Sequence, residues 1–370
     1  MKGMRIYDSP GRFLEENTLG AVYLYDCDEN RVLAARNEHT RMPVASLTKI
    51  ATAMTILESV PDPSRAMVRV REESVEETIR LEGKLAGFQD RIGESFSVLD
   101  CLYPFLVSSG CDAGLVLADD LSGGDRAAFM ERINACAERT GCRNTHFRDP
   151  NGLLDEGVST AFDIFLLFRR MLENPLLRRI TATERWTVPG LAEPVLQTNC
   201  LKRFDSPFFF PYTCGSKTGT TDLAGRCLAC SFRRRGHTWI AVVLGRPFIP
   251  GEEGIRDFYD DIVTSLLLSA YVREAPFMRL TAEDHLIRAG VGEEITLRPR
   301  ILFSNAREEP VYRYVSLNPE VAEADENGHI RVLDRGIAQI GITVQTGDYD
   351  LVCVNACGGD RIRVERREMR

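Results

Sequence analysis

The sequence predicts an α+β domain followed by a small all-β domain. Apolar residues recur at three- and four-residue spacing over 46–59, as in an amphipathic helix. Residues 239–244 form a continuous apolar run that suits a buried strand, and after Pro276 the chain changes to short β-type segments. A length of 370 residues fits two or three domains. We expect a larger α+β domain over 1–275, a β-sandwich over 276–359 and a charged tail over 360–370.

The first region mixes strands and helices along its length. Residues 21–24 and 31–34 flank a polar turn, which predicts a hairpin. The apolar stretch 226–232 and the run 239–244 predict buried strands. The helices expected here, besides 46–59, are 99–107, 112–121, 125–140 and a long one over 255–272.

The second region contains short apolar segments separated by turn residues such as those at 325–328. Such spacing is typical of a β-sandwich. The last eleven residues are highly charged, and we expect them to be frayed. The strands are expected over 295–297, 311–315, 329–333, 339–344 and 351–354.

The overall composition is that of a globular protein and excludes some functions. A formal net charge of −8 and a pI near 5.4 argue against a nucleic-acid binder, which would present a basic face. No apolar run reaches the roughly 20 residues that a membrane-spanning helix needs. The first ten residues also lack the apolar core of a secretory signal.

Cysteine is abundant, with 11 residues, and the odd number leaves at least one without a partner in the chain. Cys227 and Cys230 have the spacing of half a zinc site, but no matching second pair follows them. Because their surroundings are those of a buried strand, we interpret them as core residues. The cysteine pattern is compatible with an oxidising or a reducing compartment.

Lysine is rare in this arginine-rich chain, since only 5 of the 46 basic residues are lysine. An amine can lose a proton, whereas a guanidinium cannot under ordinary conditions. The few lysines of this chain are therefore candidates for residues that take up or release a proton. Two of them, Lys49 and Lys217, lie in the motifs described next.

The first motif is Ser46-Leu47-Thr48-Lys49, at the start of the predicted helix. A spacing of three residues brings the two polar side chains to one helix face. A lysine amine can then deprotonate the serine, and the helix N-terminus favours the developing negative charge. Taken alone, the pattern is better explained by a helix-capping serine followed by a solvated lysine.

The second motif is Lys217-Thr218-Gly219-Thr220, just before a strand-like stretch. The lysine and threonine can bind a carboxylate, and the glycine lets a ligand backbone lie close to a strand edge. A plain surface turn would look the same. The third motif, Ser109-Gly110-Cys111, precedes a predicted helix, and its serine can relay a proton. By itself it is an ordinary loop.

Together and in this order, the three motifs resemble those of serine penicillin-recognising enzymes. Over residues 18–275 the chain is further identified as similar to the low-molecular-mass D-alanyl-D-alanine carboxypeptidases. The resemblance implies a β-lactamase or penicillin-binding-protein transpeptidase-like fold, an antiparallel sheet with flanking helices and a helical subdomain. The blocks that carry it are Pro43 to Lys49, Asn144 to Phe147, Pro150 to Leu153, Ser159 to Asp163 and Gly215 to Gly225.

The resemblance implies acyl transfer on peptidoglycan stem peptides that end in D-Ala-D-Ala. Ser46 would be the nucleophile, Lys49 its base and Ser109 a proton relay, with backbone N–H groups of Ser46 and Thr220 as oxyanion hole. Lys217 and Thr218, beside Gly219, would hold the terminal carboxylate. β-Lactams would acylate the same serine, and no metal or organic cofactor is needed. Arg256 is a further candidate for carboxylate binding.

Two features depart from the family pattern. Cys111 stands where asparagine is usual, although some relatives also carry cysteine there, and a thiol hydrogen-bonds a substrate amide weakly. Packing in the cleft is the alternative role for this residue. The other departure is the missing signal segment and C-terminal anchor. Since the substrate is extracytoplasmic, in the bacterial cell envelope, we expect the targeting segment to be absent from this chain.

Residues 314–344 resemble bacterial immunoglobulin-like repeats of the second class, through the blocks at 316–322, 326–328 and 336–338. This domain would act as a spacer or as a contact to the cell envelope. Alternative functions for the chain are a D,D-transpeptidase or endopeptidase, and a catalytically weakened peptidoglycan- or penicillin-binding module. A β-lactamase is disfavoured because no Glu-x-x-Leu-Asn block is apparent before Lys217.

Overall fold

The structure is a computed structural model that describes residues 20–203, 206, 209–234, 236–247, 278–282, 285–304, 308–346 and 348–357. These residues fall into two compact units. The α+β unit comprises 20–202 and 212–247, and the β unit comprises the described parts of 203–211 and 278–357. The predicted helix 255–272, the boundary predicted after residue 275 and the charged tail lie outside the described residues.

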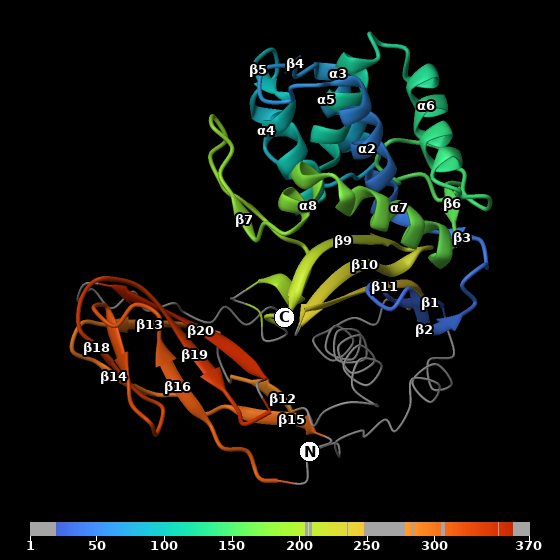
Figure 1. The fold of residues 1–370 in the computed structure, drawn as a ribbon. Helices are drawn as coiled ribbons and strands as arrows, with labels where there is room; N and C mark the ends of the chain where they lie inside the picture. The colour runs from blue at the N-terminus through green and yellow to red at the C-terminus, as the bar shows by residue number, and fades with distance from the viewer. Residues whose placement is uncertain are drawn as a thin grey trace. The chain divides into compact units, whose positions relative to one another are not determined.

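The centre of the α+β unit is a five-stranded antiparallel sheet with strand order β2-β1-β11-β10-β9 (Figure 1). The predicted hairpin and the two predicted buried strands are confirmed. The N-terminal hairpin pairs with the last strand of the unit, with Ala21 opposite Leu244. The strand β9, which carries the second motif, lies at the sheet edge. The strands are β1 (Ala21–Asp26), β2 (Arg31–Arg36), β9 (Thr213–Thr221), β10 (Gly225–Arg234) and β11 (His237–Arg246).

Helices cover this sheet and form a helical subdomain beyond it (Figure 1). Helix α2 (Lys49–Ser59) is central, and most of its residues are buried because its neighbours surround it. Helix α7 (Ala161–Glu173) packs on β1 and β11. The remaining helices of this unit are α3 (Glu72–Arg80), α4 (Val98–Tyr103), α5 (Cys111–Leu121), α6 (Arg126–Arg139) and α8 (Pro175–Thr181).

Two predicted helices differ in detail from the structure. The helix over 46–59 opens as a 3₁₀ turn, η1 (Ala45–Thr48), before α2 begins. The helix over 99–107 ends at Tyr103 and continues as a wider π turn, η3 (Pro104–Ser108). Proline has no N–H to continue an α-helical ladder, and the Pro104 carbonyl instead accepts bonds from Ser108 Oγ and Gly110 N, both at 2.9 Å.

Short elements complete the unit. The unit has three two-stranded ribbons, and two further 3₁₀ turns lie in loops. The ribbons are β3 (Met42–Pro43) with β6 (Val158–Ser159), β4 (Met67–Arg69) with β5 (Ser95–Ser97), and β7 (Arg185–Trp186) with β8 (Val195–Leu196); the turns are η2 (Phe88–Asp90) and η4 (Cys200–Lys202). Among the described helices, none is both long and apolar enough to cross a bilayer.

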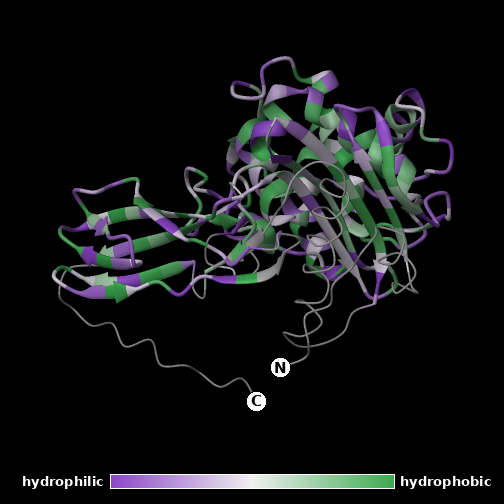
Figure 2. Cartoon of the chain, turned by 60° about the horizontal axis from the view of Figure 1, so that its bottom comes forward, coloured by the Kyte–Doolittle hydropathy of each residue, from purple (hydrophilic) through white to green (hydrophobic). Residues whose placement is uncertain are grey.

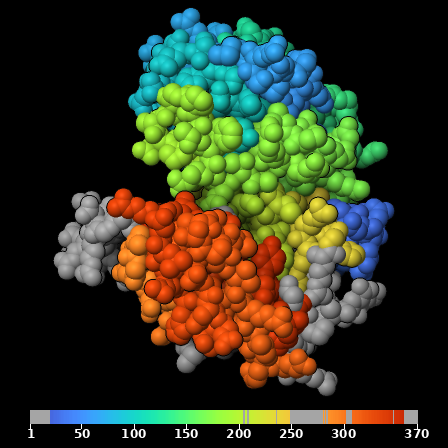
Figure 3. Space-filling view, turned by 60° about the vertical axis from the view of Figure 1, so that its left-hand side comes forward, coloured from blue at the N-terminus to red at the C-terminus, as the bar shows by residue number. Residues whose placement is uncertain are grey.

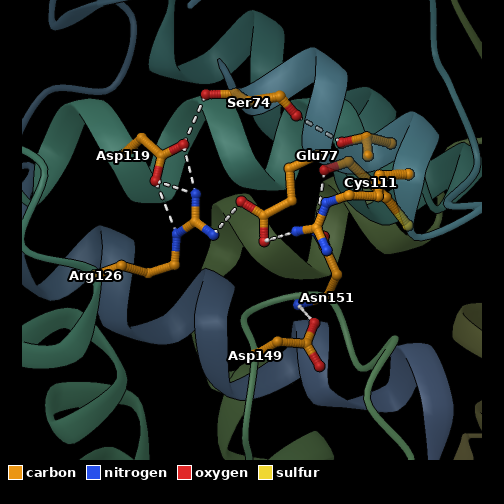
Figure 4. Close-up of polar contacts among 9 residues, drawn as sticks. Ser74, Glu77, Cys111, Asp119, Arg126, Asp149 and Asn151 are labelled. Atoms are coloured by element: carbon orange, nitrogen blue, oxygen red, sulfur yellow. Dashed lines mark hydrogen bonds and ion pairs between the residues drawn. The ribbon is translucent and has the colours of Figure 1, made fainter.

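A charged cluster ties three helices of the subdomain together (Figure 4). Arg126, at the start of α6, donates to Glu77 of α3 at 2.6 Å and to both carboxylate oxygens of Asp119 of α5 at 2.6 and 2.8 Å. Ser74 Oγ donates to the same Asp119 carboxylate at 2.7 Å. Bidentate, partly buried pairs of this kind resist solvent screening better than exposed ones.

Removing Arg126 should therefore destabilise the α+β unit. We expect Arg126→Met to lower the free energy of unfolding by about 2 kcal/mol, because two carboxylates lose their common partner. The matched control is Arg139→Met, whose pair with Glu58 is about half exposed and should cost under about 0.5 kcal/mol. Urea unfolding followed by circular dichroism compares the two, and equal losses would contradict the assigned role.

The β unit has its own apolar core. One sheet has the order β13-β20-β19-β16, with β13 and β20 parallel, and a second has the order β14-β18-β17. Side chains from both sheets, such as Ile330 and Ile340, form one buried cluster, as in a sandwich. In Figure 3 these strands, coloured orange and red, make a continuous surface. The strands are β12 (Met278–Thr281), β13 (Leu286–Gly290), β14 (Glu294–Thr296), β15 (Arg300–Ser304), β16 (Arg313–Ser316), β17 (Ala322–Ala324), β18 (His329–Val332), β19 (Gly336–Thr343) and β20 (Tyr349–Cys357).

The predicted all-β character of this region is confirmed. Its strands alternate buried residues with exposed or partly buried ones, as at 329–332 and 336–343. Figure 2 shows both apolar and polar positions along the strands of this unit. The strand predicted over 311–315 is β16, which runs from Arg313 to Ser316. The resemblance to an immunoglobulin-like repeat stays a prediction.

Among the described residues, the ten cysteines from Cys27 to Cys353 form no disulfide bond. Cys227 and Cys230 lie on β10 and are buried, in agreement with their interpretation as core residues. Three residues along a strand point their side chains to opposite faces, so these two do not converge on a common ligand. Burial raises the pKa of the Cys227 thiol to about 12.

Candidate active site

Ser46 lies on the 3₁₀ turn that opens α2, and this turn is tightly held. Ala45 adopts a left-handed conformation with φ of 48°, which is strained for a residue other than glycine. Gly152 approaches so closely that a Cβ there would lie 1.9 Å from the Ala45 carbonyl oxygen. From the other side, a Cβ on Gly219 would lie 2.7 Å from the Val44 carbonyl oxygen. The serine is thus clamped between the loop at 150–153 and strand β9.

Lys49 is the first residue of α2 and is fully buried. Its amine donates to Ser46 Oγ at 3.0 Å and to the Asn151 carbonyl oxygen at 2.9 Å, and lies 3.4 Å from Cys111 Sγ. The Phe105 ring lies beneath it at 5.6 Å. An amine held in direct contact with a serine hydroxyl, away from water, is the arrangement that a lysine base requires.

Lys217, on β9, is the second buried amine of the site. It donates to Ser109 Oγ at 2.9 Å and to the Thr218 carbonyl oxygen at 2.7 Å. Burial, followed by the nearby charge of Lys49, holds the pKa of this amine well below its ordinary value. Keeping this buried amine protonated therefore costs free energy, and a bound carboxylate would offset that cost.

Ser109 lies in the short loop that joins η3 to α5, and Cys111 is the first residue of α5. Ser109 has a left-handed backbone with φ of 64°, and its hydroxyl meets Lys217. Gly110 allows close packing, because a Cβ there would lie 2.6 Å from Ala86 Cβ. Cys111 is buried with its thiol toward Lys49, so the residue that replaces the usual asparagine is part of the site.

Asn151 is a residue for which the sequence analysis gave no role. Its carbonyl oxygen accepts from Lys49, and its side-chain amide donates to the Cys111 carbonyl at 3.0 Å. Asp149 accepts from Asn151 N and Leu153 N, which fixes the loop (Figure 4). Gly114 of α5 leaves the space that the Asn151 side chain occupies. The only signal in the sequence was the resemblance block at 150–153.

Thr198 is a second such residue. Its hydroxyl lies 2.6 Å from that of Thr218, and its backbone N–H donates to the Val107 carbonyl at 3.1 Å. The contact orients the Thr218 hydroxyl beside Lys217. Nothing in the sequence around Thr198 marks it as a partner of a residue twenty positions away.

The predicted site residues gather around one cavity of about 320 Å³ in the α+β unit. Lys49 and Lys217 lie beneath it, next to Ser46 and Ser109. Arg256 lies outside the described residues. The cavity is lined by Ser46, Glu82, Lys84, Ser109, Cys111, Leu153, Thr198, Thr218, Gly219, Thr220, Arg226 and Cys227.

Outside this cavity, the described residues offer one group with metal-ligand spacing. Ligand atoms of Asp26, Asp28 and His237 lie within 4.8 Å of one another. The Asp26 carboxylate already accepts bonds from two backbone N–H groups, of Asp28 and Glu29, and from the Trp239 indole. These hydrogen bonds satisfy the buried Asp26 carboxylate and stabilise the turn that follows β1.

Comparison with known proteins identifies the family of this chain. A family model described as D-alanyl-D-alanine carboxypeptidase matches residues 15–247. The D-alanyl-D-alanine carboxypeptidase DacF of Bacillus subtilis is 29% identical over 61% of this chain and 57% of its own length. A D-alanyl-D-alanine endopeptidase of Pseudomonas aeruginosa is 32% identical over 58% of this chain and 67% of its own length. The chain thus spans little more than half of the first of these relatives.

Known structures share the fold. The DD-transpeptidase of Streptomyces K15 superposes with a TM-score of 0.61 and 23% identity, over 68% of this chain and 97% of that one. A D-alanyl-D-alanine carboxypeptidase from Mycobacterium tuberculosis superposes with a TM-score of 0.60 and 23% identity, over 74% of this chain and 95% of that one. The penicillin-binding-protein type of fold predicted for the first domain is confirmed.

Proposed function

Because the chain belongs to the D-alanyl-D-alanine carboxypeptidase family, we propose that it removes the terminal D-alanine from peptidoglycan stem peptides through an acyl-enzyme on Ser46. The observation that carries this proposal is the 3.0 Å contact between the Ser46 hydroxyl and the buried Lys49 amine at the base of the cavity. The second serine–lysine contact, between Ser109 and Lys217 at 2.9 Å, supports it.

Acylation begins when the Lys49 amine takes the Ser46 hydroxyl proton and Oγ bonds to the carbonyl carbon of the penultimate D-alanine. The backbone N–H groups of Ser46 and Thr220 receive the oxyanion. The peptide C–N bond then breaks, and a proton reaches the leaving nitrogen through Ser109. Lys217 and Thr218 hold the leaving carboxylate, with Thr198 orienting the Thr218 hydroxyl.

Deacylation follows the same path with water as the nucleophile. Lys49 takes a proton from water, which attacks the ester carbon and returns Ser46 to its hydroxyl form. The action on peptidoglycan implies a place in the bacterial cell envelope, and the β unit would serve as a spacer or envelope contact. The endopeptidase alternative rests on the name of the Pseudomonas relative.

The experiment that tests the function is intact-protein mass spectrometry after incubation with benzylpenicillin, on the wild type and on Ser46→Ala. We expect the wild type to gain the mass of the whole β-lactam and the variant to gain nothing. Release of D-alanine from an N-acylated peptide then separates carboxypeptidase from endopeptidase action. A folded wild type without adduct would refute the acyl-serine mechanism and favour a binding module.

The pH dependence of substrate binding tests the role of Lys217. Its amine binds a carboxylate only when protonated, and its pKa is well below the ordinary value of 10.5. As pH rises through this lowered pKa, kcat/KM for D-Ala-D-Ala peptides should fall by up to about tenfold per pH unit. Lys217→Arg stays charged and should lose this alkaline limb. The same limb in both proteins would contradict the assignment.

A further inference from the structure

The loop at 149–157 is held in a fixed shape by its own hydrogen bonds. The Asp149 carboxylate accepts from three backbone N–H groups that follow it, at 2.8 to 3.1 Å. One of these is the N–H of Asn151 (Figure 4). The Gly157 N–H donates to the Leu154 carbonyl at 3.0 Å and closes the loop. A loop fixed in this way can hold other parts of a site at set positions.

The first half of this loop contacts the turn that carries the nucleophile. A Cβ on Gly152 would lie 1.9 Å from the Ala45 carbonyl oxygen and 2.7 Å from Thr48 Oγ1. The Asn151 carbonyl accepts from the Lys49 amine at 2.9 Å. The loop and the turn η1 are therefore fixed to each other.

The second half of the loop contacts the end of strand β9. Thr221 Oγ1 donates to the Asp155 carboxylate at 2.6 Å and accepts from the Ala224 N–H at 3.0 Å. Because the backbone N–H can only donate, the hydroxyl proton is left for the carboxylate, which accepts it. Asp155 and Thr221 are both partly buried. Asp155 thus ties the loop to the residue that follows Thr220.

Thr220 supplies one of the two oxyanion-hole donors in the proposed mechanism, and Ser46 supplies the other. Strand β9 lies at the edge of the described sheet, so one row of its backbone N–H groups faces away from β10. A Cβ on Gly219 would lie 3.1 Å from Ser46 N, so β9 meets the nucleophile turn beside these donors. An oxyanion hole works only when both donors lie within hydrogen-bond distance of the oxyanion, so the placement of β9 against η1 matters for the rate.

From these contacts we propose that Asp155 is a positioning residue for the oxyanion hole. Through the Thr221 hydroxyl it holds the Thr220 N–H in place. Gly152 fixes the turn that bears the other donor, the Ser46 N–H, so the loop sets the distance between the two. The inference rests on the proposed function of Ser46 and gives a role to a residue that does not line the cavity.

A change of the reacting carbonyl tests this role. The probes are an N-acylated depsipeptide ending in D-alanyl-D-lactate and its thiono form, in which sulfur replaces the oxygen of the scissile ester carbonyl. Sulfur is larger and accepts hydrogen bonds weakly, so an oxyanion hole favours the oxygen form. In single turnovers with excess enzyme, Asp155→Ala should slow acylation by the oxygen form about thirtyfold and by the thiono form less than about threefold. A general loss of structure would slow both forms alike.

Three further variants sharpen the test. Asp155→Asn keeps an oxygen that can accept from Thr221, and should return the oxygen-form rate to within about fivefold of the wild type. Thr221→Val should match Asp155→Ala, and the double variant should be no slower than either single one. The matched control, Glu156→Ala, removes a carboxylate from an exposed position of the same loop and should keep both rates. Equal slowing of the two forms in Asp155→Ala, or additive losses in the double variant, would overturn the assignment.

Acylation of wild-type Ser46 by benzylpenicillin tells a failure of this inference from a failure of the proposed function. If Ser46 does not acylate, the amide NMR resonance of Thr220 replaces the rate as the readout. It should shift in Asp155→Ala, return towards its wild-type position in Asp155→Asn and stay in place in Glu156→Ala. A Thr220 resonance that does not respond to the loss of the Asp155 carboxylate would overturn the positioning role.

Discussion

Lys49→Met should slow acylation of Ser46 by about 10⁴-fold or more, because it removes the only base in contact with the hydroxyl among the described side chains. A hydroxyl that keeps its proton is a poor nucleophile at any distance. Methionine has nearly the volume of the lysine side chain and fits an apolar surrounding such as Phe105, so the loss should be chemical rather than structural.

The rate of adduct formation with excess benzylpenicillin measures this effect, with thermal unfolding as a check of the fold. Lys49→Arg is the informative control, since a guanidinium can donate hydrogen bonds from the same position but cannot accept a proton near neutral pH. Both variants should be nearly inactive. Acylation within tenfold of the wild-type rate in either of them would show that another group deprotonates Ser46.

The Gly152→Ala substitution should be the most damaging change of a single small residue. It meets a positive φ of 74° and places Cβ 1.9 Å from the Ala45 carbonyl oxygen, which is backbone and cannot rotate away. The turn that carries Ser46 must then shift. We expect a loss of about 3 kcal/mol in the free energy of unfolding and a fall in acylation rate of about 10²-fold.

The Gly123→Ala variant separates the cost of the positive φ from the cost of the steric clash. Gly123 also has a positive φ, of 64°, but nothing lies within 4 Å of the position of its Cβ. This variant should lose only the conformational cost, about 1 kcal/mol, and keep the wild-type acylation rate. Equal destabilisation of the two variants would mean that the approach of Gly152 to Ala45 does not hold the nucleophile in place.

The part of the site that short-range patterns encode was predictable from the sequence. The three-residue spacing of Ser46 and Lys49 brings them into contact across the junction of η1 and α2, and apolar runs predicted the strands β10 and β11. Asn151 and Thr198 were not predictable in their roles, because one acts through a backbone carbonyl and the other through a hydroxyl far along the chain.

Local chemistry also explains what was wrong in detail. The helical pattern over 99–107 continues through Pro104, but periodicity says nothing of how a proline alters the hydrogen-bond ladder, and the turn widens there. The strained backbones of Ala45, Glu82 and Ser109 likewise have no signature in composition, since only tertiary contacts impose them.

The pairing of the first strand with the last strand of the sheet has a consequence for folding. Ala21 meets Leu244 in β11, so this part of the sheet forms only after more than two hundred residues of chain have closed into a loop. Contacts of such sequence separation slow folding and leave unpaired strand edges exposed meanwhile. A nascent or truncated chain that ends before β11 can form helix α2 but cannot complete the sheet against which Ser46 is clamped. Activity should therefore appear only after β11 has joined the sheet, in a single step of folding.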